Sequence, residues 1–274
     1  MTSDEKYISL ISMEFEDIRR IGIGAAYKGG EVLSDYFGRI SDIRKKGAID
    51  LVTEADVNAE KAILEILRTR CPDHAVLAEE SGAGAGNSDY RWIIDPLDGT
   101  TNYTHRLGLF CVSIACEFKG NMAVGIVLNP ITGELFTAIQ GQGAQLNGRP
   151  IRVSDTDRLS DSLLVTGFPY DLQEHLDPLM TRFANCLKSA QGVRRLGSAA
   201  LDLCFVACGR FDGFWEENLH PWDTAAGMLI AIEAGARVTD FSGGPYQIKS
   251  STILATNGRI HEEMIPILAI KDMQ

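Results

Sequence analysis

Long apolar segments are absent from this 274-residue sequence. No run approaches the roughly 18 to 20 apolar residues that a membrane-spanning helix needs. The first residues, Met-Thr-Ser-Asp-Glu-Lys-Tyr, show no basic segment leading into an apolar one, so a secretory signal is not indicated. We therefore expect a cytoplasmic protein without a membrane partner.

The sequence also lacks paired cysteines at short spacing. No two of the six cysteines form a C-x-x-C motif, which argues against a zinc site and a thioredoxin-like redox site. Scattered cysteines in a chain of this length are typical of reduced, mostly buried thiols. They are Cys71, Cys111, Cys116, Cys186, Cys204 and Cys208.

Basic residues are in the minority. Lys and Arg number 26 against 37 Asp and Glu, so the net charge is −11 and the sequence pI is about 4.9. An acidic surface of this kind is a poor partner for nucleic acid or an anionic membrane. It is compatible with a small anionic substrate if metal ions, bound by the surplus carboxylates, invert the local field.

The hydrophobic periodicity predicts helices and strands in mixed order. We expect helices at residues 4–38, 54–69, 174–188, 198–208 and 222–234 and from about residue 259. We expect strands at residues 74–78, 91–94, 109–118, 122–128, 134–139, 163–166, 211–216 and 253–255, with a flexible glycine-rich loop at 82–87. This order favours a layered α+β sandwich and argues against a TIM barrel. A polar stretch near 149–160 divides one domain, residues 1–274, into halves at about 1–150 and 151–274.

The most informative segment is Trp92-Ile-Ile-Asp-Pro-Leu-Asp-Gly-Thr-Thr-Asn-Tyr103, in which an apolar strand leads into two acids. We expect Pro96 and Gly99 to turn the chain sharply, so that Asp95, Asp98 and the Leu97 carbonyl face one point. Carboxylates and a carbonyl are ligands that suit Mg²⁺. The N–H groups near Gly99 and Thr100 could bind an anion at a helix start. A simple turn favours the same residue types and is the alternative.

Three other acidic segments stand at the ends of predicted elements. Asp56 lies in the first turn of the 54–69 helix, where a capping box with Thr53 is an equally good explanation. Glu79 follows a strand and lies in an acidic pair that a solvated surface would also explain. Asp223 lies in the first turn of a helix, where acids are favoured in any case.

Glu79, Asp95, Asp98 and Asp223 have no basic residue in their immediate segments. Carboxylates brought together repel one another unless cations neutralise them. Together they are typical of a site for two or three Mg²⁺ ions, which can activate water and stabilise the oxygens of a phosphoryl transfer.

These motifs resemble a known family. Four segments are similar to the motifs of the inositol monophosphatase family and follow one another along the chain in the same order. They are DLVTEAD at 50–56, AEES at 78–81, DPLDGTTNY at 95–103 and WDTAAGMLIAIEAG at 222–235. That family comprises Mg²⁺-dependent, lithium-sensitive sugar phosphatases. The resemblance implies an αβαβα sandwich and a homodimer.

The resemblance also implies roles for individual residues. Glu79, Asp95, the Leu97 carbonyl, Asp98 and Asp223 would hold Mg²⁺, while Asp56, Glu79 and Thr100 would be catalytic. Thr100, bonded to Asp56, would activate the attacking water together with Glu79. The substrate contacts would be Asp98, Gly99, Thr100, Ala199, Glu216 and Asp223. Lys45 matches a loop lysine that reaches the site in some members, and Lys46 is the neighbouring candidate.

The implied reaction is hydrolysis of a small polyol or sugar phosphate, with inositol 1-phosphate the first expectation. Fructose 1,6-bisphosphate and histidinol phosphate are alternatives, because enzymes acting on them share the metal motifs. Arg194 or Arg195 would suit a second phosphate, although a solvated pair is an equal explanation. A regulator that binds metal or phosphate without catalysis is the alternative from another class, and the intact acidic set argues against it.

Overall fold

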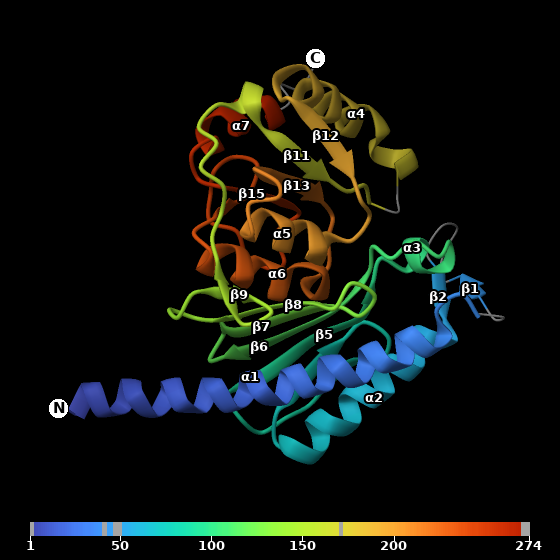
Figure 1. Cartoon of the computed structure of the whole chain (residues 1–274), viewed down its shortest axis with the longest axis vertical. Helices are drawn as coiled ribbons and strands as arrows, with labels where there is room; N and C mark the ends of the chain where they lie inside the picture. Colours follow the sequence, from blue (N-terminus) through green and yellow to red (C-terminus); the bar gives the residue numbers. More distant parts are fainter. Residues whose placement is uncertain (1–2, 40–42, 46–50, 170–171, 270–274) are drawn as a thin grey trace.

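A computed structural model describes the backbone of residues 3–39, 43–45, 51–169 and 172–269, and the side chains of residues 14–39, 54–169 and 176–269. The chain folds into two stacked sheets with helices between them and on both outer faces (Figure 1). The α+β class and the αβαβα layering predicted above are confirmed. None of the described helices is both long and apolar enough to cross a membrane.

Within the described residues, the first sheet has eight strands in the order β10-β9-β8-β7-β6-β5-β3-β4. All of its neighbours pair antiparallel except β3 and β5, which run parallel. The carboxyl ends of β3 and β5 therefore meet at one edge of the sheet. The strands are β3 (Ala75–Ala78), β4 (Gly82–Gly84), β5 (Tyr90–Asp98), β6 (Cys111–Phe118), β7 (Asn121–Asn129), β8 (Glu134–Ile139), β9 (Ala144–Leu146) and β10 (Arg149–Ile151).

Helices α1 (Ser3–Tyr36) and α2 (Glu54–Arg70) cover the outer face of this sheet (Figure 1). The buried residues of α2 recur every three or four positions, which gives one apolar face. Leu33, Ile63 and Trp92 belong to the core between these helices and the sheet. Two acids, Asp56 and Glu60, lie on the same buried face.

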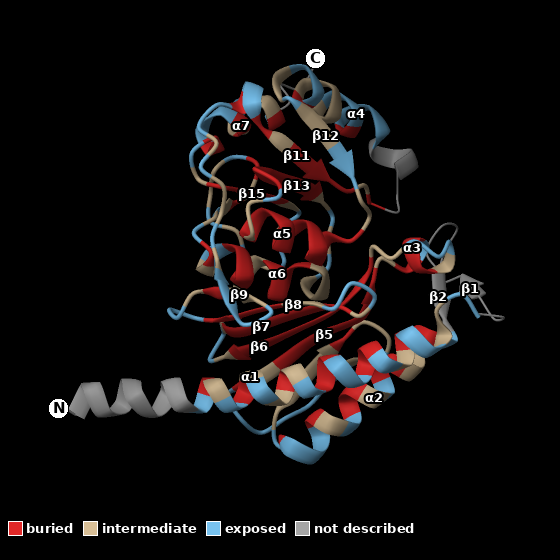
Figure 2. Cartoon of the chain, in the orientation of Figure 1, coloured by how far each residue is buried: buried red, intermediate tan, exposed pale blue. Residues whose placement is uncertain are grey.

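The second sheet has five strands in the order β12-β11-β13-β15-β14. Helices α5 (Ala199–Ala207) and α6 (Pro221–Glu233) fill the space between the two sheets, and every residue of α5 is buried (Figure 2). Helices α4 (Leu172–Ser189) and α7 (His261–Leu268) cover the far face. The strands are β11 (Leu163–Thr166), β12 (Gly192–Arg195), β13 (Gly213–Glu217), β14 (Arg237–Thr239) and β15 (Thr252–Thr256).

Short elements complete the described chain. They are β1 (Ile43–Lys45), which pairs antiparallel with β2 (Leu51–Thr53), a five-residue helix α3 (Thr100–Thr104), and a 3-10 turn at Leu159–Asp161. The segment 152–162 leads from the first sheet to the second. The division into two halves near residue 150 remains a prediction.

Two local expectations are wrong. The glycine-rich segment 82–87 is not wholly a loop, because residues 82–84 form β4 along the edge of β3. The strand that we ended at residue 94 continues as β5 to Asp98, with an irregularity in its pairing with β6 between Asp95 and Asp98. A bulge of this kind re-aims side chains without ending the strand, and the chain turns only at Gly99, whose φ is +98°.

Candidate active site

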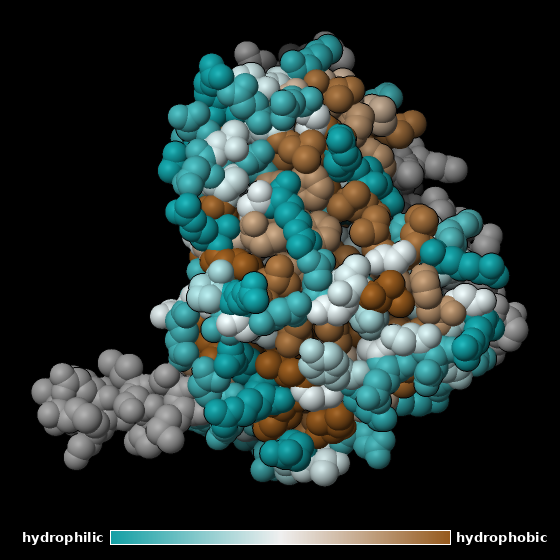
Figure 3. Space-filling view, in the orientation of Figure 1, coloured by the Kyte–Doolittle hydropathy of each residue, from teal (hydrophilic) through white to brown (hydrophobic). Residues whose placement is uncertain are grey.

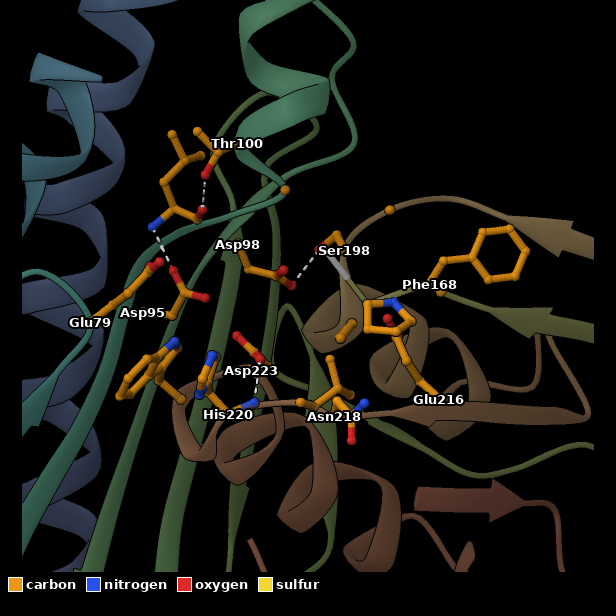
Figure 4. Close-up of a pocket in the computed structure, with 18 of the residues that line it drawn as sticks. Glu79, Asp95, Asp98, Thr100, Phe168, Ser198, Glu216, Asn218, His220 and Asp223 are labelled. Carbon is orange, nitrogen blue, oxygen red and sulfur yellow. Dashed lines mark hydrogen bonds between the residues drawn. The ribbon is translucent and has the colours of Figure 1, made fainter. Parts of the chain in front are cut away.

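A cavity of about 540 Å³ opens where the end of β5 faces the N-terminal ends of α5 and α6. Figure 4 shows the side chains that line it. Its lining residues come from both halves of the chain, so the site exists only when the two sheets are stacked. They include Glu79, Asp95, Leu97, Asp98, Gly99, Thr100, Gly167, Phe168, Arg195, Ser198, Ala199, Glu216, Asn218, His220, Trp222 and Asp223.

The bulge at the end of β5 directs its two acids into the cavity (Figure 4). Asp95 and Asp98 are only 2% and 9% exposed. Oδ1 of Asp95 accepts the Leu97 N–H at 2.9 Å, which fixes the orientation of the carboxylate. At the next turn, a Cβ on Gly99 would lie 2.9 Å from the Leu109 carbonyl oxygen, so this position requires glycine in both space and φ.

Glu79 reaches the cavity from the end of β3. Residues Ala78 and Ile94 are partners in the parallel ladder, so the next residues along each strand, Glu79 and Asp95, are neighbours. The Glu79 N–H extends the ladder by donating to the Ile94 carbonyl at 3.1 Å. Figure 4 shows the Glu79 carboxylate directed toward that of Asp95.

Thr100 and Asp56 form a contact between α3 and α2. The Thr100 hydroxyl lies 3.3 Å from Oδ1 of Asp56 and 3.1 Å from the Leu97 carbonyl oxygen, and it can donate to either. Both side chains are buried, at 7% and 1% exposure. The predicted pairing of Thr100 with Asp56 is therefore present in the structure.

Asp98 is held by the N-terminal end of α5. Its Oδ2 accepts the Ser198 hydroxyl at 2.6 Å and the Ala200 N–H at 2.8 Å. Ser198 and Ala200 could not be predicted as partners of Asp98, since they lie about a hundred residues further along the chain. Cys111 also contacts the same oxygen through its thiol, at 3.8 Å.

Asp223 stands in the first turn of α6, as predicted, and Oδ2 accepts the His220 N–H at 2.7 Å. The His220 ring stacks on Trp222 with the ring centroids 4.9 Å apart. His220 therefore orients Asp223 through its backbone, while its ring forms part of the cavity wall.

Burial and mutual repulsion raise the pKa values of the acids in this cavity. Burial raises the pKa of Asp95 well above its usual range, and the carboxylates of Glu79, Asp98 and Asp223 raise it further. The pKa of Asp223 is likewise raised well above normal, by burial and then by Asp98. The pKa of Asp98 is raised by burial, against its hydrogen bonds from Ser198 and the α5 backbone. Ionised carboxylates in this position need a compensating cation.

The donor set fits a hard divalent cation, because carboxylate oxygens and the Leu97 carbonyl line the same cavity. Asp95, Asp98 and Asp223 are each oriented by a backbone N–H. Within the described side chains, however, no group of three or more His, Cys, Asp or Glu is close enough to hold a metal ion as it stands. Cation binding would therefore require these side chains to move closer together.

The opposite end of the cavity has a different character. Glu216, on β13, is 7% exposed, and burial raises its pKa to about 8, with Asp98 raising it and Arg195 lowering it. A Cβ on Gly167 would lie 2.1 Å from a Glu216 oxygen, so glycine leaves the space that this carboxylate occupies. Ala199, at the start of α5, also lines the cavity.

The two arginines are distinguished by the structure. Arg195 lines the cavity, with its guanidinium carbon 5.8 Å from the centre of the Phe168 ring. Both side chains are exposed, but Arg194 is not among the lining residues, and it donates to the adjacent Val193 carbonyl. The side chains of Lys45, Lys46 and Thr53 lie outside the described residues, so their predicted roles stay predictions.

Comparison with known proteins identifies the family. The model of the inositol monophosphatase family matches residues 14–272. The chain is 48% identical to inositol-1-monophosphatase from Synechocystis over 98% of this chain and 94% of that protein. It is 44% identical to the protein named Nus factor SuhB from Pasteurella multocida, over 89% of this chain and 93% of the relative.

The fold agrees with these relatives. The crystal structure of extragenic suppressor protein suhB from Bartonella henselae superposes with a TM-score of 0.90 at 41% identity, covering 94% of this chain and all of that one. The chain therefore belongs to the inositol monophosphatase family, a family of metal-dependent phosphatases that typically use Mg²⁺.

Proposed function

We propose that this protein is a Mg²⁺-dependent phosphomonoesterase that hydrolyses a small polyol phosphate, with inositol 1-phosphate as its substrate. One observation carries the proposal. A single cavity has four acids and the Thr100–Asp56 pair at one end and the buried Glu216 at the other. The first end has the chemistry for a phosphoryl group with its cations, and the second end has the chemistry for hydroxyl groups.

Glu79, Asp95, the Leu97 carbonyl, Asp98 and Asp223 are the residues that would hold two or three Mg²⁺ ions. When bound, Mg²⁺ neutralises charge on the phosphoryl oxygens and makes water a stronger acid. The reaction forms a bond between a water oxygen and phosphorus and breaks the ester P–O bond, and the alcohol oxygen leaves with the bonding pair and takes up a proton from solvent water. It needs positioning more than covalent chemistry from the protein.

The chain's own residues then orient and deprotonate the water. The Thr100 hydroxyl can accept a proton from the attacking water while donating its own to Asp56, which lies 3.3 Å away. Glu79 is the second acceptor for that proton. We assign the Gly99 and Thr100 N–H groups to the phosphate.

Substrate choice is set at the far end of the cavity. The carboxyl group of Glu216 can exchange hydrogen bonds with hydroxyl groups, and Ala199 lines the same cavity, which supports a polyol. Arg195 also lines this end and would suit the second phosphate of fructose 1,6-bisphosphate. Histidinol phosphate is the third substrate to compare.

Phosphate release decides between these substrates. We would assay inositol 1-phosphate, fructose 1,6-bisphosphate and histidinol phosphate, each with Mg²⁺, with EDTA, and with Mg²⁺ plus lithium. We expect Mg²⁺-dependent, lithium-sensitive turnover, with the highest kcat/KM on inositol 1-phosphate. A higher kcat/KM on another substrate would replace the proposed one.

No turnover on any of the three would favour the alternative of a binding protein without catalysis. This alternative is worth testing because some relatives are named Nus factor SuhB, a name that specifies no substrate. The presence of Asp56, Glu79, Asp95, Asp98, Thr100 and Asp223 around one cavity, or in contact with it, supports the enzyme.

We also propose a homodimer. Large apolar side chains are exposed on the described surface, among them Leu107, Ile131, Leu176, Met180 and Leu187, and Figure 3 shows apolar patches on one face. Burying such side chains in an interface between two copies is favourable. Light scattering should give twice the chain mass of 29.9 kDa, and a monomer mass would refute the dimer.

A further inference from the structure

We propose that Glu60 is a positioning residue for the metal site, because it fixes the backbone from which Glu79 projects. The inference rests on the proposed function, which makes Glu79 a metal ligand. Glu60 lies on α2 and is 3% exposed. Its Oε2 accepts the Glu80 N–H at 2.8 Å, and its Oε1 accepts the Ser81 N–H at 2.9 Å.

These two bonds fix the chain immediately after Glu79. The chain immediately before is already fixed, because Ala78 belongs to the β3–β5 ladder and the Glu79 N–H donates to the Ile94 carbonyl at 3.1 Å. Glu80 and Ser81 lie in the turn that leads into β4. The Glu79 backbone is therefore held on both sides, and Figure 4 shows its side chain directed into the cavity.

Core packing alone gives no reason for an acid at position 60. The other buried residues on this face of α2 include Ala59, Ile63, Leu64 and Leu67, and an aliphatic side chain would pack with them equally well. Asp56, one helical turn away, places a second buried carboxylate on the same face, and like charges at this spacing repel. The two hydrogen bonds that the Glu60 carboxylate accepts from the Glu80 and Ser81 N–H groups, together called the clamp, explain why position 60 has an acid.

One face of α2 thus carries two acids that position the two groups assigned to water activation, Thr100 and Glu79. Asp56 contacts Thr100, and Glu60, four residues later, holds the turn that carries Glu79. Residues that orient a metal ligand typically change metal affinity or activity by about 10- to 100-fold when they are replaced. We expect an effect of this size at Glu60, with little effect on substrate contacts at Glu216.

The test compares two variants that remove the same kind of clamp. Glu60→Gln keeps the shape but offers one acceptor oxygen and turns an NH₂ group toward the second backbone N–H. The matched control is Glu233→Gln on α6, since both oxygens of Glu233 accept backbone N–H groups, from Gly141 and Gly143, at 2.8 Å. Glu233 is not among the residues that line the cavity.

The first measurement is Mn²⁺ binding to the full chain, by electron paramagnetic resonance of the free ion. We expect Glu60→Gln to weaken Mn²⁺ binding about tenfold and to lower kcat at saturating Mg²⁺, with KM for substrate changed less than about twofold. Glu233→Gln should leave Mn²⁺ affinity and kcat within about twofold of the original chain.

Equal Mn²⁺ affinity in Glu60→Gln and the original chain would overturn the inference while leaving the proposed function intact. An original chain that binds no Mn²⁺ and releases no phosphate would refute both. Hydrogen exchange on the original chain covers the case in which Glu60→Gln does not fold. The Glu80 and Ser81 amides should be protected, and exchange at the rate of an open loop would overturn the clamp.

Discussion

At the scale of single residues, the site is organised by hydrogen bonds that set the direction of each acid. Leu97 N–H orients Asp95, the Ser198 hydroxyl and Ala200 N–H orient Asp98, and His220 N–H orients Asp223. A carboxylate held by fixed donors loses little conformational entropy when it binds a cation. The same arrangement lowers the stability of the fold without a cation, because several like charges are buried in one cavity.

Asp95→Asn tests this balance. The amide has the same shape but no charge, so we expect kcat to fall by at least about a thousandfold, equivalent to about 4 kcal/mol of transition-state stabilisation. In EDTA the variant should melt above the original chain, because one of the repelling buried carboxylates is gone. Phosphate release and thermal unfolding measure the two effects.

The exposed Asp89, just before β5, provides the control for Asp95. Asp89→Asn should leave both kcat and the midpoint temperature of thermal unfolding nearly unchanged. An Asp95→Asn variant that kept a tenth or more of the original kcat would contradict the role given to Asp95.

His261 predicts a pH dependence of stability that is independent of the active site. It is fully buried between Thr239 and Thr256, whose hydroxyls lie 2.9 and 2.8 Å from its two ring nitrogens. Burial lowers its pKa to about 4 from 6.5, and Arg237 adds to the effect while Glu262 opposes it. As pH falls below 6.5, His261 is protonated in the unfolded chain but stays neutral in the folded chain until about pH 4. The free energy of unfolding therefore decreases between about pH 6.5 and 4.

Urea unfolding of the original chain and of His261→Gln at pH 7.5 and pH 5 measures this effect. The original chain should lose about 2 kcal/mol more than the variant over that interval. Equal losses in the two proteins would show that His261 does not titrate in this way.

At the scale of elements, the close approach of α5 and α6 brings two parts of the site together. Gly227 on α6 makes this possible, because a Cβ there would lie 2.9 Å from Cβ of Leu203 and 3.1 Å from the Ala200 carbonyl oxygen. The N-terminal end of α5 holds Asp98, and the first turn of α6 carries Asp223. Pushing these helices apart would move both acids.

Gly227→Ala is therefore expected to reduce activity and stability together. Overpacking of this kind costs about 1 to 3 kcal/mol, and we expect kcat to fall at least about tenfold. Gly24→Ala is the matched control, because Gly24 is an exposed glycine of α1 with no atom within 4 Å of the added Cβ. Alanine in an open helical position should raise stability by up to about 1 kcal/mol. Unfolding in urea and phosphate release measure both variants, and unchanged activity in Gly227→Ala would contradict the argument.

The elements differ in how far the sequence could predict them. The long helices were predicted to within a few residues, because their apolar positions recur with helical period over several turns. The three-residue strands β1, β2, β4, β9, β10 and β14 are too short to show a period and could not be predicted. The four-residue strand β12 has the sequence Gly-Val-Arg-Arg, which shows no apolar pattern. The bulge in β5 could not be distinguished from a turn, because Pro and Gly are typical of both.

At the scale of the whole molecule, the site depends on contacts between distant parts of the chain. The Asn102 amide donates to the carbonyls of Leu109 and Leu196, both at 2.7 Å, and so joins α3 to the loop before α5. Motifs at the ends of elements predicted which acids face the cavity. They could not predict Ser198, Ala200 or Glu60 as partners, because those pairs form only when the layers pack.

The packing of α6 on the first sheet also couples metal binding to global stability. The acids that would hold the cation come from the first sheet and from the first turn of α6, so a cation bound there joins two layers of the fold and binds the folded chain in preference to the unfolded one. At a Mg²⁺ concentration of about 100 times Kd, the fold should gain about 2.7 kcal/mol. For a chain of this length the melting midpoint should rise by at least about 5 °C.

General screening of the net charge of −11 would also raise the midpoint, so the control is NaCl at the same ionic strength. We expect NaCl to produce only a small part of the Mg²⁺ effect. Asp95→Asn should lose most of the Mg²⁺ effect and keep the NaCl effect, because it removes a ligand and only one of many surface and buried charges. Equal shifts with NaCl and Mg²⁺, or a full Mg²⁺ shift in Asp95→Asn, would mean that Mg²⁺ acts on the whole acidic surface and not at the cavity between the sheets.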